Sequence, residues 1–411
     1  MTGGALISVE EALARVLASA REPLGEESVA LGDALGRTLA REVRASRAQP
    51  PFASSAMDGY ALRAADAAHP GARLAAVGES AAGRAFVGRL AAGQAARIFT
   101  GAPMPDGADA VVAQEEARRE GDTVALEAGV SPGENVRARG SDFEEGEATL
   151  AAGRRLTPRD VALAAAADCA SLVVRRRPRV AILSAGDELV APGAARGPAQ
   201  VVASNAFAVA GVVAAAGGEP IDLGLAADDP TALAASLARA REANADVLAT
   251  LGGASVGDHD LVRQALAEAG MEIDFWRIAM RPGKPMILGR LGATTVLGLP
   301  GNPASSMVCA LLFLRPLLRA LVGDPEAGAD PSEPARLAVA LGPNGARRTY
   351  LRAALTRDGD GALLARPAPS QDSSLIKTLA RADALIVRPP DAPRAAAGDP
   401  CRVIRFAALG A

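Results

Sequence analysis

The chain has 411 residues and a net charge of −3, and 49% of its residues are hydrophobic. This length exceeds what one compact core supports, so we expect roughly two to four domains. The net negative charge argues against a general nucleic-acid binder, whose affinity needs many phosphate contacts. The three cysteines lie far apart and only two histidines occur, which argues against a disulfide framework, a zinc site and a Ser/His/Asp triad.

The N-terminal segment predicts a helix rather than a targeting signal. Ser8 and Glu11 in "SVEEALARVLASA" have the spacing of a capping box that opens an amphipathic helix. Charged residues interrupt the apolar stripe that a signal peptide needs. No run of about 18 uncharged apolar residues occurs, so we expect no membrane span. The expectation is a cytoplasmic protein that has neither a membrane nor a nucleic acid as its partner.

Helical and β-like patterns alternate in the first half of the chain. Residues 8–45 show helical spacing of apolar positions, broken at "PLG", and "LTPRDVALAAAADCA" predicts a helix that Thr157 caps and Pro158 opens. Between them, residues 50–145 alternate short apolar runs with Gly, Pro and Asp, as strands and loops do. In "PPFASSAMDGYAL" the "DG" pair predicts a turn, and Met57 is expected in the core.

From residue 178 onward, apolar strands alternate with amphipathic helices. The strands include "RVAILSA", "EPIDLGLA", "ADVLATL", "MEIDFWRIAM" and "TTVLGL". Such alternation predicts a largely parallel sheet in a three-layer arrangement, with helices on both faces. After the linker-like residues 323–335, short strands such as "ADALIVRPP" and "CRVIRF" predict a small β domain, in which "DGDG" is a hairpin turn.

The sequence therefore predicts a multidomain α/β protein with four parts. A helical N-terminal domain is discontinuous, and a β-rich insert interrupts it. The α/β domain follows, and a small β domain ends the chain. The predicted boundaries are 1–50 with 146–177, 51–145, 178–326 and 331–411.

Acidic and glycine-rich loops follow three of the predicted strands. Because parallel strands end at one edge of a sheet, the loops "SAGDEL", "AADDP" and "LGGASVGDHD" should meet there. Each acidic pair alone is more often a helix cap or a solvated loop, but together the carboxylates suit Mg²⁺ held against phosphates. The glycines allow backbone to approach a ligand, although neither a dinucleotide fingerprint nor a P-loop is present. The residues concerned are Asp187, Glu188, Asp228, Asp229, Gly252, Gly253, Asp258 and Asp260.

Two further loops should bring cations and hydroxyls to the same edge. "RPGKP" carries Arg281 and Lys284, and Lys284 is one of two lysines in the chain. A compact ammonium can meet a tetrahedral oxyanion as a point charge, whereas a planar guanidinium prefers bidentate geometry and needs more room. "LPGNPASS" ends a strand and opens a helix that Asn302 is expected to cap, and the hydroxyls of Ser305 and Ser306 suit an oxyanion. The alternatives are a salt-bridge network and an ordinary strand–helix connection.

A series of motifs resembles the MoeA-type molybdopterin molybdenumtransferases, the family that includes the gephyrin E domain. The resemblance spans roughly residues 8–390 and implies insertion of molybdate into adenylylated molybdopterin with release of AMP, dependent on Mg²⁺. It also implies a homodimer whose cleft uses both subunits, and we expect a transient contact with the adenylyltransferase of the same pathway. The motifs, in chain order, are "PPFASSAMDGYAL", "FTGAPMPDGADAVV", "GSDFEEGE", "SAGDEL", "LGGASVGDHD", "RPGKP" and "GLPGNPASS".

The resemblance also implies roles for individual residues. The catalytic group would be Asp58, Thr100, Asp142, Glu188, Asp228, Asp260 and Lys284, of which Glu188, Asp228 and Asp260 would hold the metal. The molybdate-binding group would be Arg281, Lys284 and Ser305, joined by Arg347 and Ser373 of the last domain through "RRTYLR" and "QDSSL". Their position in the loops adds Asn302, Gly252 and Gly253 to the substrate-binding residues. The family commonly has lysine where Arg281 stands.

Two other functions fit the same resemblance. One is a non-catalytic dimeric scaffold of the gephyrin E-domain type, and the other is a paralogue that inserts tungstate. The acidic and cationic loops favour an enzyme, because a scaffold need not keep them. An assay of AMP release with each anion separates these functions.

Overall fold

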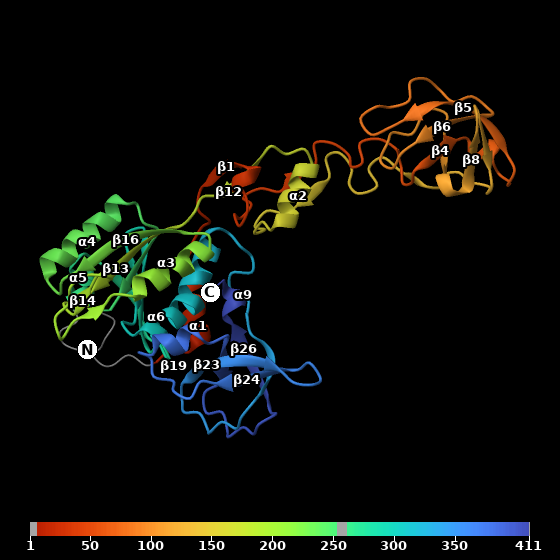
Figure 1. The fold of residues 1–411 in the computed structure, drawn as a ribbon. Helices are drawn as coiled ribbons and strands as arrows, with labels where there is room; N and C mark the ends of the chain where they lie inside the picture. Colours follow the sequence, from red (N-terminus) through yellow and green to blue (C-terminus); the bar gives the residue numbers. More distant parts are fainter. Residues whose placement is uncertain (1–5, 253–260, 411) are drawn as a thin grey trace.

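The computed structural model describes residues 6–252 and 261–410. Figure 1 shows an elongated molecule with a body at one end, made of the α/β domain and the C-terminal domain. A narrow arm leaves the body and contains β1 (Glu26–Ala30), β12 (Ser171–Arg175) and α2 (Pro158–Ala166). The insert domain lies at the far end of the arm. The predicted fold class is therefore confirmed.

The α/β domain is built on a six-stranded sheet in the order β16-β13-β17-β21-β20-β18. Four strands run parallel, as predicted, and β20 and β18 pair antiparallel beside them. β20 is not among the predicted strands, because Pro285 opens it and Gly289 interrupts it. The bounds are β13 (Arg179–Ala185), β14 (Leu189–Val190), β15 (Val201–Val202), β16 (Glu219–Ala226), β17 (Val247–Leu251), β18 (Glu272–Arg277), β20 (Pro285–Leu291) and β21 (Thr294–Leu299).

Helices cover both faces of this sheet, as the alternating pattern predicts. α4 (Pro230–Glu242) and α5 (Leu261–Glu268) share one core with the sheet. The other core contains α1 (Val9–Ser19), α3 (Asn205–Ala215) and a long helix made of α6 (Pro303–Cys309), the π-helical η4 (Ala310–Leu314) and α7 (Arg315–Leu321). Helix α1 thus packs in the α/β body, although the predicted boundaries group residues 1–50 with the N-terminal domain.

The long helix is the buried centre of the body. Among the described residues, Pro303–Leu321 is long and apolar enough to cross a membrane by length and composition, yet 72% of it is buried inside the protein. Cys309, Phe313 and Leu317 are completely buried. A helix that is apolar all round is what the core of a large domain requires, so packing accounts for its composition.

The arm is mostly β-structure where the sequence predicts helices. β1 pairs antiparallel with β12, and β2 (Val43–Arg44) pairs with β11 (Ala148–Leu150), while η1 (Leu31–Asp33) is a single 3₁₀ turn. The prediction of helices up to residue 45 is wrong, because pairing partners far away in the sequence override local spacing. The predicted start of α2 is confirmed, since Asp160 accepts hydrogen bonds from the amide and the hydroxyl of Thr157.

The insert domain is a six-stranded sheet in the order β7-β4-β6-β5-β9-β8. Its core holds Leu62, Leu74 and Val112. Met57 is 42% exposed, so its expected place in the core is wrong: it lies in the turn before β4, and the strands themselves fill the interior. The bounds are β3 (Ser54–Ser55), β4 (Gly59–Leu62), η2 (Ala64–Asp66), β5 (Arg73–Ser80), β6 (Gln94–Ile98), β7 (Ala110–Ala113), η3 (Gln114–Glu116), β8 (Ala117–Glu120), β9 (Thr123–Leu126) and β10 (Val136–Arg137).

The C-terminal domain is a small closed barrel, because β23 pairs with both β24 and β25 in the order β19-β23-β24-β22-β26-β25. Residues 358–361 turn between β23 and β24, as "DGDG" predicts. β19 belongs to the loop after β18, so a loop of the α/β domain pairs with the barrel. The bounds are β19 (Met280–Arg281), β22 (Glu333–Leu337), β23 (Arg348–Arg357), β24 (Leu363–Pro367), α8 (Ile376–Ala380), β25 (Ala384–Arg388), β26 (Pro400–Arg405) and α9 (Phe406–Leu409).

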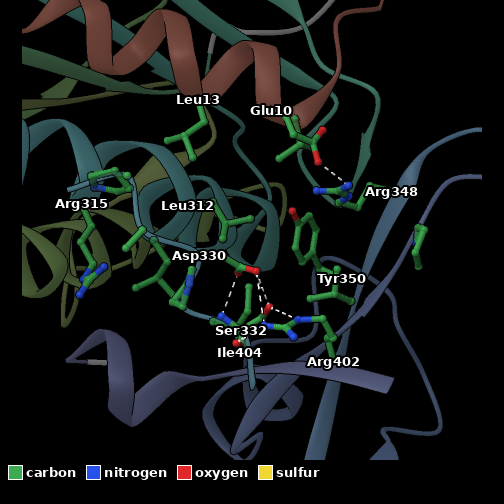
Figure 2. Close-up of a pocket in the computed structure, with 18 of the residues that line it drawn as sticks. Glu10, Leu13, Leu312, Arg315, Asp330, Ser332, Arg348, Tyr350, Arg402 and Ile404 are labelled. Carbon is green, nitrogen blue, oxygen red and sulfur yellow. Dashed lines mark hydrogen bonds and ion pairs between the residues drawn. The ribbon is translucent and has the colours of Figure 1, made fainter. Parts of the chain in front are cut away.

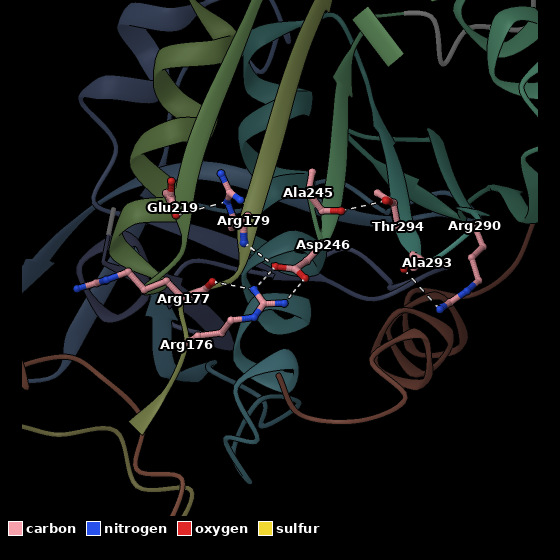
Figure 3. A network of polar contacts seen from close by, with 9 residues as sticks. All are labelled: Arg176, Arg177, Arg179, Glu219, Ala245, Asp246, Arg290, Ala293 and Thr294. Carbon is pink, nitrogen blue, oxygen red and sulfur yellow. Dashed lines mark hydrogen bonds and ion pairs between the residues drawn. The ribbon is translucent and has the colours of Figure 1, made fainter. Parts of the chain in front are cut away.

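A polar network joins the arm to the amino ends of the parallel strands (Figure 3). Arg176, just after β12, donates to both carboxylate oxygens of Asp246 at 2.7 and 2.8 Å. The same carboxylate accepts from the amide of Arg179 at 2.8 Å, and the Thr294 hydroxyl donates to the carbonyl of Ala245. These contacts fix how the arm leaves the body, at the sheet edge opposite the predicted site.

Candidate functional site

The loops that the sequence places at one edge of the sheet do meet there. β13, β16, β17 and β21 run parallel, and β18 shares their direction because each of two successive pairings is antiparallel. The loops after these strands therefore leave from the carboxyl edge, where open α/β sheets bind ligands. Of "LGGASVGDHD", the structure describes only the residues up to Gly252, so Gly253, Asp258 and Asp260 lie outside the described residues.

A pocket of about 630 Å³ opens at this edge. Six separate segments supply its wall, represented by Glu188, Val202, Gly252, Pro285, Asn302 and Ser374. The last of these belongs to the C-terminal domain, so the pocket lies between that domain and the sheet. Gly252 has a φ of +93°, and a Cβ there would lie 3.0 Å from the carbonyl oxygen of Ala185. Glycine is thus required at this bend of the pocket wall.

Carboxylates form one side of the site. The amide of Asp228 donates to Asp187 Oδ1 at 3.0 Å, which joins the loops after β16 and β13. Partial burial raises the pKa of the Asp228 carboxyl, and the negative charges of Asp187 and Glu188 raise that pKa further. Asp229, the other acid of "AADDP", caps α4 by accepting from Ala232 N. Asp229 is therefore a helix cap, as the alternative for these acidic pairs states, whereas Asp228 lies near other carboxylates.

These carboxylates do not by themselves complete a metal site. Within residues 6–252 and 261–410, no three acidic, histidine or cysteine side chains lie close enough together to hold an ion. Of the predicted metal ligands, the structure describes Glu188 and Asp228, whereas Asp260 lies outside the described residues. The mutual repulsion at Asp228 is the environment that a bound cation relieves.

The "RPGKP" loop places its two cations differently. Arg281 is exposed and lines a smaller pocket of about 260 Å³ against the barrel, together with Thr349 and Gln371. Lys284 is half-buried and directly precedes Pro285 of the edge pocket. Its carbonyl accepts from Ile278 N at 3.0 Å, whereas its ammonium has no hydrogen bond or ion pair with the described residues. A cation held on a paired backbone with its charge unmatched suits an anionic ligand.

The start of α6 forms the opposite wall. Asn302 occupies the N-cap position and Pro303 the first turn, as predicted, but the side chain of Asn302 makes no capping bond. The prediction that the side chain of Asn302 caps the helix is therefore wrong, and Asn302 lines the pocket instead. Ser305 and Ser306 are 5% and 1% exposed. Among the described residues, Ser306 Oγ has no hydrogen-bond partner.

The C-terminal barrel reaches the site through one loop. The amide of Ala304 on α6 donates to the carbonyl of Ser373 at 2.9 Å, so this loop contacts the helix that carries Ser305, while the role of Ser373 stays a prediction. Arg347 is half-buried just before β23, and the structure shows no contact of its side chain with the edge pocket. Arg347 stays a prediction.

Two positioning residues are not among the predicted ones. Arg352 is 2% exposed and donates to Gln371 Oε1 and to the Asp372 carbonyl, which holds the loop that carries Ser373. Asn205, the first residue of α3, donates from Nδ2 to the carbonyl of Gly301 at 2.6 Å. The bonds of Arg352 and Asn205 join segments that are distant in sequence, so no local sequence pattern predicts these contacts. The only signal is the polar pair "SN" at the start of α3.

The site residues predicted from the first half of the chain adjoin strands β4, β6 and β10. Figure 1 shows that the arm separates the insert domain, with β4 and β6, from the α/β sheet. Asp58 Oδ1 accepts from both the amide and the hydroxyl of Thr100, at 2.7 and 2.8 Å. These bonds lower the pKa of Asp58, and the charge of Arg97 lowers it slightly more. Asp142 is exposed, and its amide donates to Gln49 O. The structure brings Asp58 and Thr100 together, but not to Lys284 of the same chain.

A larger pocket, of about 880 Å³, lies between α1, the long helix and the barrel (Figure 2). Leu13, Leu312 and Ile404 make much of its wall apolar, and Glu10 forms an ion pair with Arg348 across one side. Burial raises the pKa of Tyr350 in its wall to about 12. None of the predicted site residues lines this pocket, so it is not the candidate site.

The fold and the edge pocket define a class: multidomain α/β proteins that bind a ligand at the carboxyl ends of parallel strands. Three family models cover most of the chain. They are the MoeA N-terminal region (domain I and II) at residues 7–167, a probable molybdopterin binding domain at 181–320 and the MoeA C-terminal region (domain IV) at 334–406. The chain belongs to the MoeA family of molybdopterin molybdenumtransferases.

Relatives from several organisms support this assignment. A molybdopterin molybdenumtransferase of Nostoc sp. is 40% identical over 88% of this chain and 85% of its own length. Molybdopterin molybdenumtransferase 2 of Mycobacterium tuberculosis is 35% identical over 95% and 97%. A crystal structure of a molybdopterin biosynthesis MoeA protein from Pyrococcus horikoshii matches with a TM-score of 0.83 at 32% identity, over 98% of this chain and 99% of that one.

Proposed function

We propose that the protein inserts molybdate into adenylylated molybdopterin, releases AMP and yields the molybdenum cofactor. One observation carries the proposal: loops bearing Glu188, Asp228 and Lys284 meet at the edge where α6 begins. A substrate with a phosphoanhydride that reacts with an oxyanion needs carboxylates for a metal on one side and a fixed cation on the other. The names of the relatives supply the substrate class.

The carboxylate side fits Mg²⁺ that arrives with the substrate. Mg²⁺ usually binds through one or two protein carboxylates and completes its shell with phosphates and water. Glu188 and Asp228 would hold it, with Asp260 as a third proposed ligand. Bound there, Mg²⁺ supplies positive charge to the phosphoanhydride. Asp187 keeps the two loops together through its bond from the Asp228 amide.

The cationic side fits molybdate as a substrate. Lys284 projects from a loop whose backbone is paired on both flanks, through Ile278 N and through β19 to the barrel. Its ammonium would bind one molybdate oxygen, Arg281 would assist, and Ser305 would donate from α6. Arg347 and Ser373 would close the site from the barrel. Asn302 and the backbone at Gly252 and Gly253 would contact the pterin substrate.

A homodimer would complete this site. Asp58 directly precedes β4, Thr100 follows β6 and Asp142 lies between β10 and β11. Figure 1 shows β4 and β6 in the insert domain, which the arm separates from the α/β sheet of the same chain. A two-fold arrangement would let the insert domain of one subunit cover the pocket of the other. We propose that this dimer acts in the cytoplasm and receives the adenylylated pterin from the adenylyltransferase through a transient contact.

The two lysines allow a matched test of the molybdate site. Purified protein is incubated with adenylylated molybdopterin and Mg²⁺, and AMP is measured as molybdate is titrated. Lys284→Ala should raise the half-saturating molybdate concentration about ten- to a hundredfold, because a charge-assisted contact is worth roughly 1.5–3 kcal/mol. Lys377→Ala removes the exposed lysine of α8 and should leave half-saturation unchanged. Equal values for both variants would exclude Lys284 from the site.

Mixing two impaired variants tests the shared cleft, when AMP release is measured at a molybdate concentration far below the half-saturation of Lys284→Ala. Asp58→Ala and Lys284→Ala proteins are unfolded and refolded together, so that mixed dimers form. If each site takes Asp58 from one subunit and Lys284 from the other, roughly a quarter of wild-type sites should be restored. No recovery in a demonstrably mixed dimer contradicts a cleft between subunits. If the wild-type protein is dimeric but never releases AMP, it fits the alternative of a non-catalytic scaffold. Repeating the titration with tungstate tests the alternative of a tungstate-inserting paralogue.

A further inference from the structure

The backbone at Gly283, beside Lys284, lies against two sulfur atoms. Gly283 has a φ of +107°, and a Cβ there would lie 2.5 Å from Cys309 Sγ and 3.0 Å from Met280 Cε. These distances are roughly 0.5–1.5 Å shorter than an ordinary van der Waals contact. Cys309 is completely buried on α6, and Met280 is equally buried at the start of β19. The loop therefore rests on a fixed surface with no room for a side chain.

The thiol also contacts the loop through a polar interaction. Cys309 Sγ donates to the carbonyl of Gly283 at 3.7 Å. Burial strongly raises the pKa of this thiol, so it remains protonated and able to donate. A thiol is a weak donor, and the contact matters mainly because it fixes the height of the loop above α6.

This contact joins the two elements that carry the proposed molybdate group. Ser305 lies one helical turn before Cys309 on α6, and Lys284 directly follows Gly283. The Lys284 carbonyl is held by Ile278 N, so the residue cannot move without its neighbour. The depth to which Gly283 sits on Cys309 therefore sets the separation between the Lys284 loop and the turn of Ser305.

We propose that Cys309 and Met280 are positioning residues, which seat Gly283 so that Lys284 and Ser305 are correctly spaced for the oxyanion. This inference rests on the proposed function, because it gives the loop's spacing a role in molybdate binding. Neither sulfur atom contacts the substrate. A change beneath the loop should therefore alter molybdate affinity while leaving the binding of the pterin substrate unchanged.

A pair of substitutions tests this directly. Gly283→Ala places a methyl group against Cys309 Sγ and should raise the half-saturating molybdate concentration roughly ten- to a hundredfold, since misplacement by about 1 Å has effects of that order. Cys309→Ala lets the loop move closer to α6 and should raise the half-saturating molybdate concentration by a smaller factor. In the double variant the clash with sulfur is gone, so part of the loss caused by Gly283→Ala should be recovered. In all three, half-saturation by adenylylated molybdopterin should stay within about twofold of wild type.

Leu317→Ala is the control for simple destabilisation. Leu317 is equally buried on the same long helix but belongs to its α7 end. It should lower thermal stability at least as much as Cys309→Ala without changing the ratio of the two half-saturation constants. If Leu317→Ala changes that ratio in the same way, or if the Gly283 and Cys309 effects are strictly additive, the positioning role is refuted.

Hydrogen exchange separates this inference from the proposed reaction. Amides of residues 279–286 should exchange faster in Cys309→Ala than in wild-type protein or in Leu317→Ala, whether or not AMP is released. Unchanged exchange in this segment overturns the seating of the loop. If Cys309→Ala exchanges faster but the wild-type protein neither binds molybdate nor releases AMP, the contact of Gly283 with Cys309 is supported and the proposed function is rejected.

Discussion

Arg352→Met tests how the C-terminal barrel holds its part of the site. Arg352 is 2% exposed, and it donates from Nε to Gln371 Oε1 at 3.2 Å and from Nη1 to the Asp372 carbonyl at 2.9 Å. Methionine keeps the unbranched stem but removes both donors. Gln371 Oε1 would still accept from the backbone amide of residue 352, at 2.9 Å. The Asp372 carbonyl would still accept from the amide of Leu375, at 3.2 Å.

The size of the loss follows from these contacts. A hydrogen bond from a charged donor contributes about 1.5–3 kcal/mol net, and a partner left unpaired in the interior costs about as much. Since both acceptors keep another donor, neither is left unpaired, and we expect the barrel to lose about 1.5–3 kcal/mol of unfolding free energy. The loop at residues 370–375 should lose its seat first, because both bonds end there. Molybdate half-saturation should rise with it.

Hydrogen exchange and fluorescence measure this effect in separate domains. Amides of residues 370–375 should exchange faster in Arg352→Met, while the unfolding of the α/β domain, followed by the fluorescence of Trp276, should change little. Arg357→Met is the matched control, because Arg357 is exposed on the same strand and its side chain donates to Gly361 O at 2.7 Å, outside the loop at residues 370–375. Identical exchange in Arg352→Met and wild type would refute the role given to Arg352.

Three further changes test the electrostatics and packing. Asp228→Asn should raise thermal stability at pH 7 without Mg²⁺, because the pKa of Asp228 is raised in the folded protein. This gain in stability should vanish near pH 4, where the carboxyl protonates in the unfolded state. The thermal shift caused by Mg²⁺ should be lost in the same variant. Ser306→Ala removes a hydroxyl that lacks a partner among the described residues, so denaturation should show equal or higher stability, by up to about 1–3 kcal/mol, with molybdate half-saturation unchanged. Arg176→Met breaks the paired bonds to Asp246 and should cost about 1–3 kcal/mol, seen by Trp276 fluorescence, with a broader distribution of arm orientations in small-angle scattering.

The body of the molecule could be predicted because its patterns are local. "RVAILSA" and "ADVLATL" are largely apolar runs, and each is followed along the chain by a helix, so strand, helix and direction could be inferred without knowing any tertiary contact. The arm could not be predicted in this way. Residues 26–30 have no helix-breaking residue, and only the antiparallel partner at 171–175 makes them a strand.

The candidate site divides along the same line. The rule that parallel strands end at one edge was enough to place the loops that carry Glu188, Asp228 and Lys284 at the same edge of the sheet. It could not reveal that Arg352 holds the Ser373 loop, because that contact depends on how the barrel closes. Met57 shows a related failure, since an apolar residue in a tight turn points outward whatever its hydrophobicity.

Molybdate-dependent release of AMP is the measurement closest to the central claim. Wild-type protein, adenylylated molybdopterin and Mg²⁺ are combined, and AMP is followed over time before and after molybdate is added. We predict little AMP beforehand and, on addition, release of one AMP for each pterin converted to molybdenum cofactor. If AMP fails to appear although the protein binds the pterin, or appears at the same rate without any oxyanion, the protein is not the transferase proposed here.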